Sequence, residues 1–219
     1  LLVYEGDVNI SRGIERFIKA VEHLPDGYRL VVIGTDAVYG LRAADGKVLW
    51  HRRLDSVAAV DGPPPVATPV NRLPNADVLL LDGGGTELLR ISSDTGTARW
   101  RLRFEQPVLS PVIAGGTALV AEKSGKLHWL DLQKGTTSGF LQFPQPLPVA
   151  PAVDEKLGLV FQPADHSSIF VLSLNEKKAV GVIYLGHAPG TIGISPVVVH
   201  GYLLVAVNTG AKSATIYIL

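Results

Sequence analysis

The sequence of 219 residues contains no cysteine and no methionine. The lack of cysteine excludes disulfide bonds, thiolate catalysis and cysteine-ligated zinc, but it does not fix the cellular compartment. Because methionine is missing even at the first position, we expect a processed product or an excised part of a longer chain. No apolar run reaches the ~18 residues of a membrane-spanning helix. No signal peptide is visible, although an excised start could have lost one.

An excess of charge of either sign is also absent, because 20 basic residues balance 20 acidic residues. A neutral chain gives no electrostatic reason to expect nucleic acid or an anionic membrane as partner. Charged residues make up 18% of the chain and hydrophobic residues 47%. That composition allows a sizeable core in one large domain or two small ones.

What is present is a repeated unit of strand, tight turn and strand. Residues 87–100 read as a strand, a turn closed by glycine and a second strand that carries a tryptophan. Residues 38–50 repeat this pattern, and residues 126–135 repeat it more weakly. Apolar and polar residues alternate along these segments, whereas helical repeats would need apolar residues three and four positions apart.

A proline followed by a short apolar strand recurs at Pro69, Pro111, Pro151 and Pro196. The intervals are 42, 40 and 45 residues, and four-stranded propeller blades repeat every ~40–45 residues. We therefore predict an all-β fold, a β-propeller of four-stranded blades, with about five blades in this chain.

The first predicted blade has three strands and the last lacks its outermost strand. Two explanations stay open. The chain can be part of a larger ring, or residues 1–8 can supply the missing strand of the last blade and close a small ring. The five predicted blades cover residues 28–54, 66–104, 108–143, 149–185 and 193–219.

The first 34 residues differ from the repeats and follow the pattern strand–helix–strand. Residues 1–4 and 28–34 read as strands, and Ser11 can cap a helix between them. We therefore divide the chain into an N-terminal strand and helix, residues 1–27, which is an insertion or leftover segment, and propeller repeats, residues 28–219. The apolar face of the predicted helix consists of Ile14, Phe17, Ile18, Val21 and Leu24.

Residues 1–34 also resemble part of the nucleotide-sugar-binding domain of GT-B glycosyltransferases. In that family a strand ending in glycine is followed by a basic loop, a helix and another strand, and Gly6, Arg12 and Gly13 match these features. Asp7 stands where the family has an arginine for the diphosphate, and the acidic donor-sugar motif is missing. The resemblance implies a glycosyltransferase remnant that would bind a nucleotide sugar near Gly6 and Arg12.

The repeats resemble those of the quinoprotein-like (PQQ-repeat) propellers. That repeat reads as a strand, Ala or Gly with Leu, then Asp, a small residue, Gly, Lys, an apolar pair and Trp. Residues 40–50 match it closely and residues 91–100 match well. Residues 130–135 match in part, with Phe140 near the tryptophan position, and residues 169–185 keep only the strand pattern. The resemblance implies that the tryptophan and the turn glycine dock neighbouring blades, so we interpret four residues as structural: Trp50, Trp100, Gly46 and Gly96.

The PQQ-repeat family implies two kinds of function. Some members are dehydrogenases that hold pyrroloquinoline quinone and calcium, are usually much longer, and often carry adjacent cysteines at the cofactor. Others act as scaffolds without a cofactor, such as the lipoprotein that helps to insert outer-membrane barrels. We expect a non-enzymatic scaffold with a protein partner and no cofactor, and a quinone-dependent dehydrogenase or its remnant is the alternative. An extracytoplasmic location is favoured by the resemblance alone.

Three further patterns show no recognisable chemistry, so no catalytic, metal-binding or cofactor-binding residue is predicted. Residues 82–87 contain three glycines without the lysine of a phosphate loop or the ligands of a calcium loop, so we expect a flexible hairpin. Residues 165–168, Asp-His-Ser-Ser, contain the residue types of a hydrolase triad, but neighbours on one turn cannot form its geometry. The histidines form no metal signature and we expect them to be structural or exposed: His23, His51, His128, His166, His187 and His200.

Arg99, Arg101 and Arg103 alternate along the fourth predicted strand of the second blade. Because strand side chains point to opposite faces in turn, we expect all three to face one side. Lys123 and Lys126 add local basic character. Solvent exposure is the simplest interpretation, and a binding edge for an acidic partner is the alternative.

Overall fold

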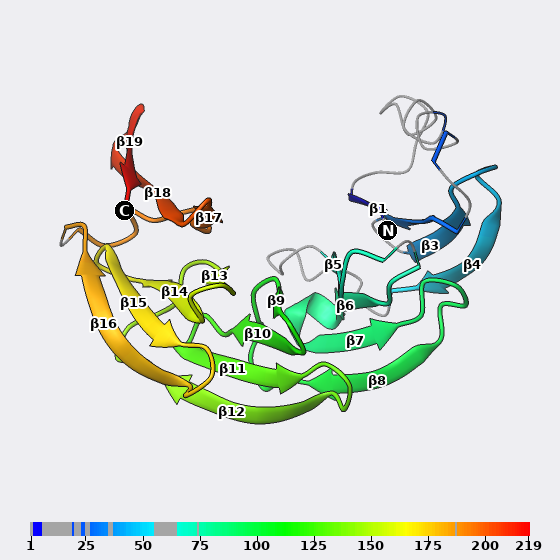
Figure 1. Cartoon of the computed structure of the whole chain (residues 1–219), viewed down its shortest axis with the longest axis horizontal. Coiled ribbons are helices and arrows are strands. Elements are labelled where there is room, and N and C mark those ends of the chain that lie inside the picture. Colours follow the sequence, from blue (N-terminus) through cyan, green and yellow to red (C-terminus); the bar gives the residue numbers. More distant parts are fainter. Residues whose placement is uncertain are drawn as a thin grey trace. The chain divides into compact units, whose positions relative to one another are not determined.

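The structure is built almost entirely of β-strands (Figure 1). It is a computed structural model that describes residues 2–5, 19, 23–24, 27–34, 37–54, 65–73, 75–186 and 188–219. In this part of the chain the strands form four four-stranded sheets and one three-stranded sheet. Sheets of consecutive strands joined by short turns are the blades of a β-propeller, so the predicted fold class is confirmed.

The chain divides into two compact units, Leu1–Pro107 and Val108–Leu219. The first unit holds the first and second blades, and their strand orders are β1-β2-β3-β4 and β5-β6-β7-β8. A short 3-10 turn, Gly83–Gly85, joins β6 to β7 in the predicted glycine hairpin. The strands are β1 (Leu2–Glu5), β2 (Arg29–Ile33), β3 (Ala37–Arg42), β4 (Val48–Arg53), β5 (Val66–Pro69), β6 (Val78–Asp82), β7 (Glu87–Ile91) and β8 (Ala98–Arg103).

The second unit holds the third, fourth and fifth blades. Every pair of adjacent strands in these blades is antiparallel. The fifth blade has three strands, as predicted. The strands are β9 (Val112–Ala114), β10 (Thr117–Ala121), β11 (Lys126–Asp131), β12 (Thr136–Gln142), β13 (Ala152–Asp154), β14 (Leu159–Ala164), β15 (Ser168–Ser173), β16 (Lys178–Tyr184), β17 (Val197–Val199), β18 (Tyr202–Gly210) and β19 (Ser213–Ile218).

Strand β1 corrects two expectations about the first blade. It pairs in parallel with β2, so the first blade has four strands instead of three. The hypothesis that residues 1–8 complete the last blade was therefore wrong for Leu2–Glu5. Parallel neighbours need a long crossover connection, and this one runs from residue 6 to residue 28, the range in which a helix is predicted. That helix lies outside the described residues except for Lys19, His23 and Leu24, and the predicted boundary at residue 27 stays a prediction.

The recurring prolines mark the innermost strands, although not all in the same way. Pro111, Pro151 and Pro196 directly precede β9, β13 and β17, as predicted. Pro69 instead ends β5. The innermost strand is an edge strand, and an edge tolerates a residue without a backbone N–H donor.

Four blades share one turn between their third and fourth strands. Its last residue has a positive φ of 68° at Gly46, 69° at Gly96, 67° at Gly135 and 53° at Lys177. In each turn the N–H of this residue donates to the carbonyl oxygen four residues earlier, at 2.8–3.0 Å. Glycine accepts this left-handed conformation without steric cost, which explains why glycine recurs at this position in three of the blades.

A β-bulge follows the same turn in each of these blades. One extra residue of the fourth strand faces the third strand at the start of the pairing. The bulge shifts the side-chain alternation, so period-two counting from the turn fails there. The extra residues are Leu49, Arg99, Ser138 and Val180.

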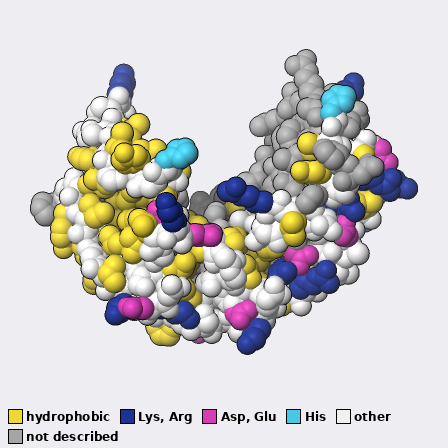
Figure 2. Space-filling view, viewed as in Figure 1, with side chains coloured by type: hydrophobic (Ala, Val, Ile, Leu, Met, Phe, Trp, Pro, Cys, Tyr) yellow, Lys and Arg dark blue, Asp and Glu magenta, His cyan; other side chains and the backbone are white. Residues whose placement is uncertain are grey.

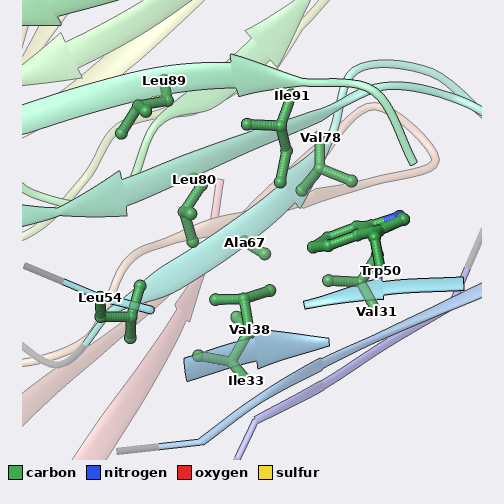
Figure 3. Close-up of a cluster of buried hydrophobic side chains, with 10 residues drawn as sticks. All are labelled: Val31, Ile33, Val38, Trp50, Leu54, Ala67, Val78, Leu80, Leu89 and Ile91. Carbon is green, nitrogen blue, oxygen red and sulfur yellow. The ribbon is translucent and has the colours of Figure 1, made fainter. Parts of the chain in front are cut away.

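Within the first unit, apolar side chains of the first and second blades form one core (Figure 3). The Trp50 ring lies beside Val31, and residues of β6 and β7, such as Val78 and Ile91, lie on the other side of the core. The opposite face of the first blade is buried as well, with Leu24 and Tyr28 packed against it. Apolar residues thus cover both faces of this sheet.

In the second unit two cores lie between successive blades. The third and fourth blades share a core that includes Leu119, Trp129 and Leu172. The fourth and fifth blades share a core that includes Ile169 and Val205. Packing of blade on blade therefore accounts for the largely apolar third strands.

Candidate interaction surface

The contact between the first two blades centres on Trp50 of β4. Its ring covers the α-carbon of Gly40 in β3, where a β-carbon would overlap the indole. Across the blade boundary, a β-carbon on Gly96 would lie 2.7 Å from Cδ2 of Trp50. The indole Nε1–H donates to the backbone oxygen of Ser93 at 2.7 Å. Trp50 and Gly96 therefore dock the two blades, as the resemblance implied, and both residues have a structural role.

Between the third and fourth blades a long side chain again covers a glycine, but here the glycine belongs to the outer strand and the long side chain to the turn of the next blade. Gly139 of β12 occupies the register position of Trp50, and the tryptophan of this blade, Trp129, stands opposite it in β11. Lys177, which takes the place of the turn glycine, covers Gly139 and donates through Nζ to the Ser138 backbone oxygen and Oγ at 2.9 Å. The long side chain thus comes from the turn of the fourth blade instead of the outer strand of the third.

Two sequence interpretations, of Phe140 and of Trp100, can be compared with this geometry. Phe140 does not replace the docking tryptophan, because it lies one position further along β12, opposite His128, and is 58% exposed. Trp100 does lie at the register position of Trp50, opposite Arg90. Its predicted contact with a neighbouring blade stays a prediction.

The arginines of β8 bind two acidic side chains of their own sheet. Arg101 and Arg103 both approach Oε1 of Glu87, at 3.3 and 2.8 Å. Arg99 approaches Oδ2 of Asp77 at 3.5 Å, and Arg90 approaches the same oxygen at 2.8 Å. Each carboxylate is therefore shared by two guanidinium groups.

The prediction that all three arginines face one side was wrong for Arg99. It is the extra residue of the bulge, so the alternation is broken between Arg99 and Arg101. Arg99 consequently shares Asp77 with Arg90, whose register partner is Trp100, while Arg101 and Arg103 share Glu87. Guanidinium groups thus lie on both sides of the outermost strand.

The acidic groups of this cluster are recessed and the arginines point outward. The side chains of Asp77 and Glu87 are 13% and 6% exposed, whereas those of Arg99, Arg101 and Arg103 are 57%, 42% and 77% exposed. Basic side chains accordingly gather beside acidic ones over the region of β7 and β8 (Figure 2). A partner that approaches this cluster would therefore meet the arginine side chains before the two carboxylates.

The same two positions of every outermost strand are exposed in the first four blades. They follow the register position of Trp50 by one and three residues, and we call these eight residues the outer-strand row. Their chemistry changes from blade to blade: basic in the first two, mixed in the third and apolar in the fourth. The row consists of His51 and Arg53, Arg101 and Arg103, Phe140 and Gln142, and Val182 and Tyr184.

A buried polar cluster in the third blade escaped the sequence analysis. The Glu122 carboxylate accepts a hydrogen bond from Nε2 of His128 at 2.8 Å and another from Oγ of Ser124 at 2.8 Å. Burial raises the pKa of Glu122, but the bonds from His128 and Ser124 outweigh burial, so the pKa lies below its usual value. The only sequence signal was an acidic residue at the end of an apolar strand.

Residues 165–168 form a polar loop, and no catalytic triad is assembled there. The Asp165 carboxylate accepts from the backbone N–H groups of Gly190 and His166, which lower its pKa. The hydroxyl of Ser167 donates to the Ala188 oxygen and bonds the Thr191 hydroxyl. Because the carboxylate and the hydroxyl bind the segment 188–191, the loop holds that connection in place.

The remaining candidates are dispersed. His51 stacks on Tyr39, and Lys126 lies over the ring of Phe140 at 5.4 Å. Within the described ranges no group of three or more His, Asp or Glu side chains could hold a metal ion, and no helix there is long and apolar enough to cross a membrane. The residues of the glycosyltransferase resemblance, together with His187, lie outside the described residues: Gly6, Asp7, Arg12 and Gly13.

Comparison with known proteins supports the repeat family. The PQQ-repeat family model described as "Outer membrane protein assembly factor BamB" matches residues 11–144, more than half of the chain. A search of curated proteins found no match.

Solved structures share the fold at low sequence identity. BamB from Moraxella catarrhalis has a TM-score of 0.58 at 12% identity, and the match covers 84% of this chain and 56% of that chain. Saccharomyces cerevisiae Sqt1 has a TM-score of 0.60 at 13% identity, covering 84% and 56%. BBS1N, in a complex with ARL6DN, has a TM-score of 0.62 at 15% identity, covering 86% and 60%. The match thus spans less than two thirds of these proteins' own lengths.

Proposed function

Because the chain belongs to the PQQ-repeat family described as outer membrane protein assembly factor BamB, we propose that it is a non-enzymatic scaffold that binds other proteins. A propeller framework hosts many functions, so the proposal must rest on surfaces of this chain.

The outer-strand row is the observation that carries the proposal. The blades repeat the turn, the bulge and the inter-blade contact, so these features serve the framework. The row sits at equivalent register positions in four blades, is exposed in all of them, and carries different chemistry in each. Constant packing combined with a variable exposed row suits a protein that presents distinct contact surfaces to partners.

Protein partners fit the row better than small molecules do. Tyr184 and Phe140 are 68% and 58% exposed, and Arg103 is 77% exposed. Aromatic side chains and arginine are the residue types enriched at protein–protein interfaces. BBS1N, which has a similar fold, was solved in complex with ARL6DN. That complex gives a precedent for a protein partner on such a framework.

Photo-crosslinking tests the proposal directly. A photoreactive phenylalanine analogue replaces His51, Phe140 or Tyr184 in the row, one at a time, in cells that express the protein. The control position is Leu157, which is 61% exposed but lies in the turn between β13 and β14. We expect one or a few defined protein adducts from row positions and none of the same mass from Leu157. Equal labelling at all four positions would contradict a partner-binding row.

Ligand titration separates the alternatives. The purified chain is mixed with pyrroloquinoline quinone and Ca²⁺, and separately with a nucleotide sugar. A saturable shift of the quinone absorbance would favour a dehydrogenase or its remnant. Saturable binding of the nucleotide sugar that is lost in Arg12→Ala would favour the glycosyltransferase remnant.

A further inference from the structure

We propose that β8 is the docking edge for an extended acidic segment of a protein partner. The inference rests on the proposed function, since it assigns a partner chemistry to the second-blade part of the outer-strand row. Every arginine of the chain lies before residue 104, and the basic residues of the second unit are lysines and histidines.

The charges of the arginine cluster do not cancel. Four guanidinium groups, of Arg90, Arg99, Arg101 and Arg103, meet two carboxylates. Both pairs converge on a single carboxylate oxygen, Oδ2 of Asp77 or Oε1 of Glu87. At each shared site two guanidinium groups approach one carboxylate, and because the carboxylates are recessed, the side chains of Arg99, Arg101 and Arg103 face outward.

The geometry favours carboxylates of an extended chain. Guanidinium groups present five N–H donors in a planar fork that suits a carboxylate, and the contacts with Asp77 and Glu87 already use this pairing. Arg101 and Arg103 are two positions apart on one face of a strand, about 6.6–6.8 Å along it. Acidic residues at alternate positions of an extended segment repeat at the same interval.

The position of β8 in its sheet supplies the second element of recognition. It is the last strand in the order β5-β6-β7-β8, and an outermost strand can accept an added strand alongside it. Arg99, turned by the bulge, lies on the side opposite to Arg101, so an added strand meets a guanidinium group on each of its faces. A nucleic acid offers phosphates but no strand to add to the sheet, so the edge favours an acidic peptide.

The experiment measures peptide binding to the whole 219-residue chain by fluorescence anisotropy. The probe is a labelled, capped peptide of four Glu-Thr repeats. Two reference peptides accompany it: one with the same composition but all glutamates in one block, and one with lysine in place of glutamate. A labelled oligothymidylate of similar length tests the nucleic-acid alternative.

The variants keep the closer partner of each recessed acid. In Arg99→Ser/Arg101→Ser, Asp77 retains Arg90 and Glu87 retains Arg103, each at 2.8 Å. The matched control, Arg42→Ser/Arg72→Ser, removes two exposed arginines of the same unit that are not part of β8. Thermal unfolding of each variant establishes that it is folded. A second variant, Arg99→Lys/Arg101→Lys, retains the positive charges without the planar guanidinium groups, and it serves if the serine variant does not fold.

We expect the alternating acidic peptide to bind more tightly than the block peptide, and the lysine peptide not to bind. The glutamates of the alternating peptide share one face and meet Arg101 and Arg103, so the double serine variant loses one exposed arginine–carboxylate contact and should bind about five-fold more weakly. The affinity of the lysine variant should lie between those of the unaltered chain and the serine variant. The control variant should bind the peptide as tightly as the unaltered chain does. Raising the salt concentration should weaken binding, because exposed charges are screened.

Three results would overturn the inference: no binding of the alternating peptide, equal loss in the β8 variant and the control, or tighter binding of the oligothymidylate. If adducts at His51, Phe140 or Tyr184 are still found in that case, the scaffold function stands and only the acidic partner at β8 is wrong. If those adducts are missing while the peptide binds as expected, the edge is real and the wider scaffold proposal fails.

Discussion

The indole of Trp50 lies over Gly96, a residue of the next blade, with no space for a β-carbon between them. A β-carbon on Gly96 would lie 2.7 Å from both Cδ2 and Cε3 of the ring. The indole N–H meanwhile donates to the oxygen of Ser93, three residues earlier in the same turn. One aromatic side chain therefore fixes both the distance and the orientation of the turn against its neighbour.

The substitution Gly96→Ala should destabilise the first unit strongly. It combines a left-handed conformation with displacement of Trp50, at a cost of about 1 kcal/mol for the first and about 2–3 kcal/mol for the second. Gly158→Ala is the matched control, because Gly158 has nearly the same φ, 67°, but its β-carbon would meet only Nδ2 of Asn175 at 3.9 Å. Urea unfolding followed by tryptophan fluorescence measures both; equal costs would show that Trp50 yields without penalty.

Gly40 and Gly181 each belong to the pair of residues next to the bulge in their own blade. Gly40 lies in the third strand, β3, opposite Trp50, and Gly181 lies in the fourth strand, β16, opposite Val171. The change Gly40→Ala should cost about 3 kcal/mol, because the new methyl group overlaps the indole. Gly181→Ala should instead stabilise by about 0.5 kcal/mol, because glycine weakens a strand and the nearest atom is 3.9 Å away. A destabilised Gly181→Ala would contradict the open space assigned to that position.

Lys177 adopts a conformation that the other three turns give to glycine, so its side chain should compensate for the strain. Lys177→Ala keeps the positive φ and removes the bonds to Ser138, and we expect a loss of about 1 kcal/mol. Lys177→Gly removes the bonds but also relieves about 1 kcal/mol of strain, so it should be nearly neutral. Equilibrium unfolding of the two variants side by side gives the difference, and identical stabilities would show that the turn is unstrained.

Glu122 should make the second unit sensitive to acid. Its pKa in the folded state lies below the usual value of 4.5 because the bonds from His128 and Ser124 outweigh burial. A lowered pKa contributes stability above about pH 4.5, and that contribution is lost as the pH falls through the folded pKa.

In Glu122→Gln the pH dependence of the unfolding free energy should therefore be smaller between pH 5 and pH 3 than in the unaltered chain. Ser124→Ala removes only one of the two bonds, so it should reduce the dependence in part. Urea unfolding at a series of pH values measures this, and an unchanged slope in Glu122→Gln would exclude Glu122 as the titrating group.

Local patterns in the sequence determined the blades. Alternating apolar residues and turn glycines such as Gly46 and Gly96 act within a few residues, so strands β2 to β19 and their grouping into blades could be predicted from them. The docking role of Trp50 could be expected from the repeat resemblance. For the candidate surface, the sequence supplied the three arginines of β8 as a possible binding edge.

The tertiary structure decided everything that depends on register and on partners distant in sequence. The bulge turned Arg99 away from Arg101, and only pairing across the sheet brought Asp77 and Glu87 under the arginines. The parallel pairing of β1 and the exchange of roles between Lys177 and Gly139 follow from contacts across long connections. Such contacts depend on which side chain fills a gap between blades, and residues close in sequence do not specify that.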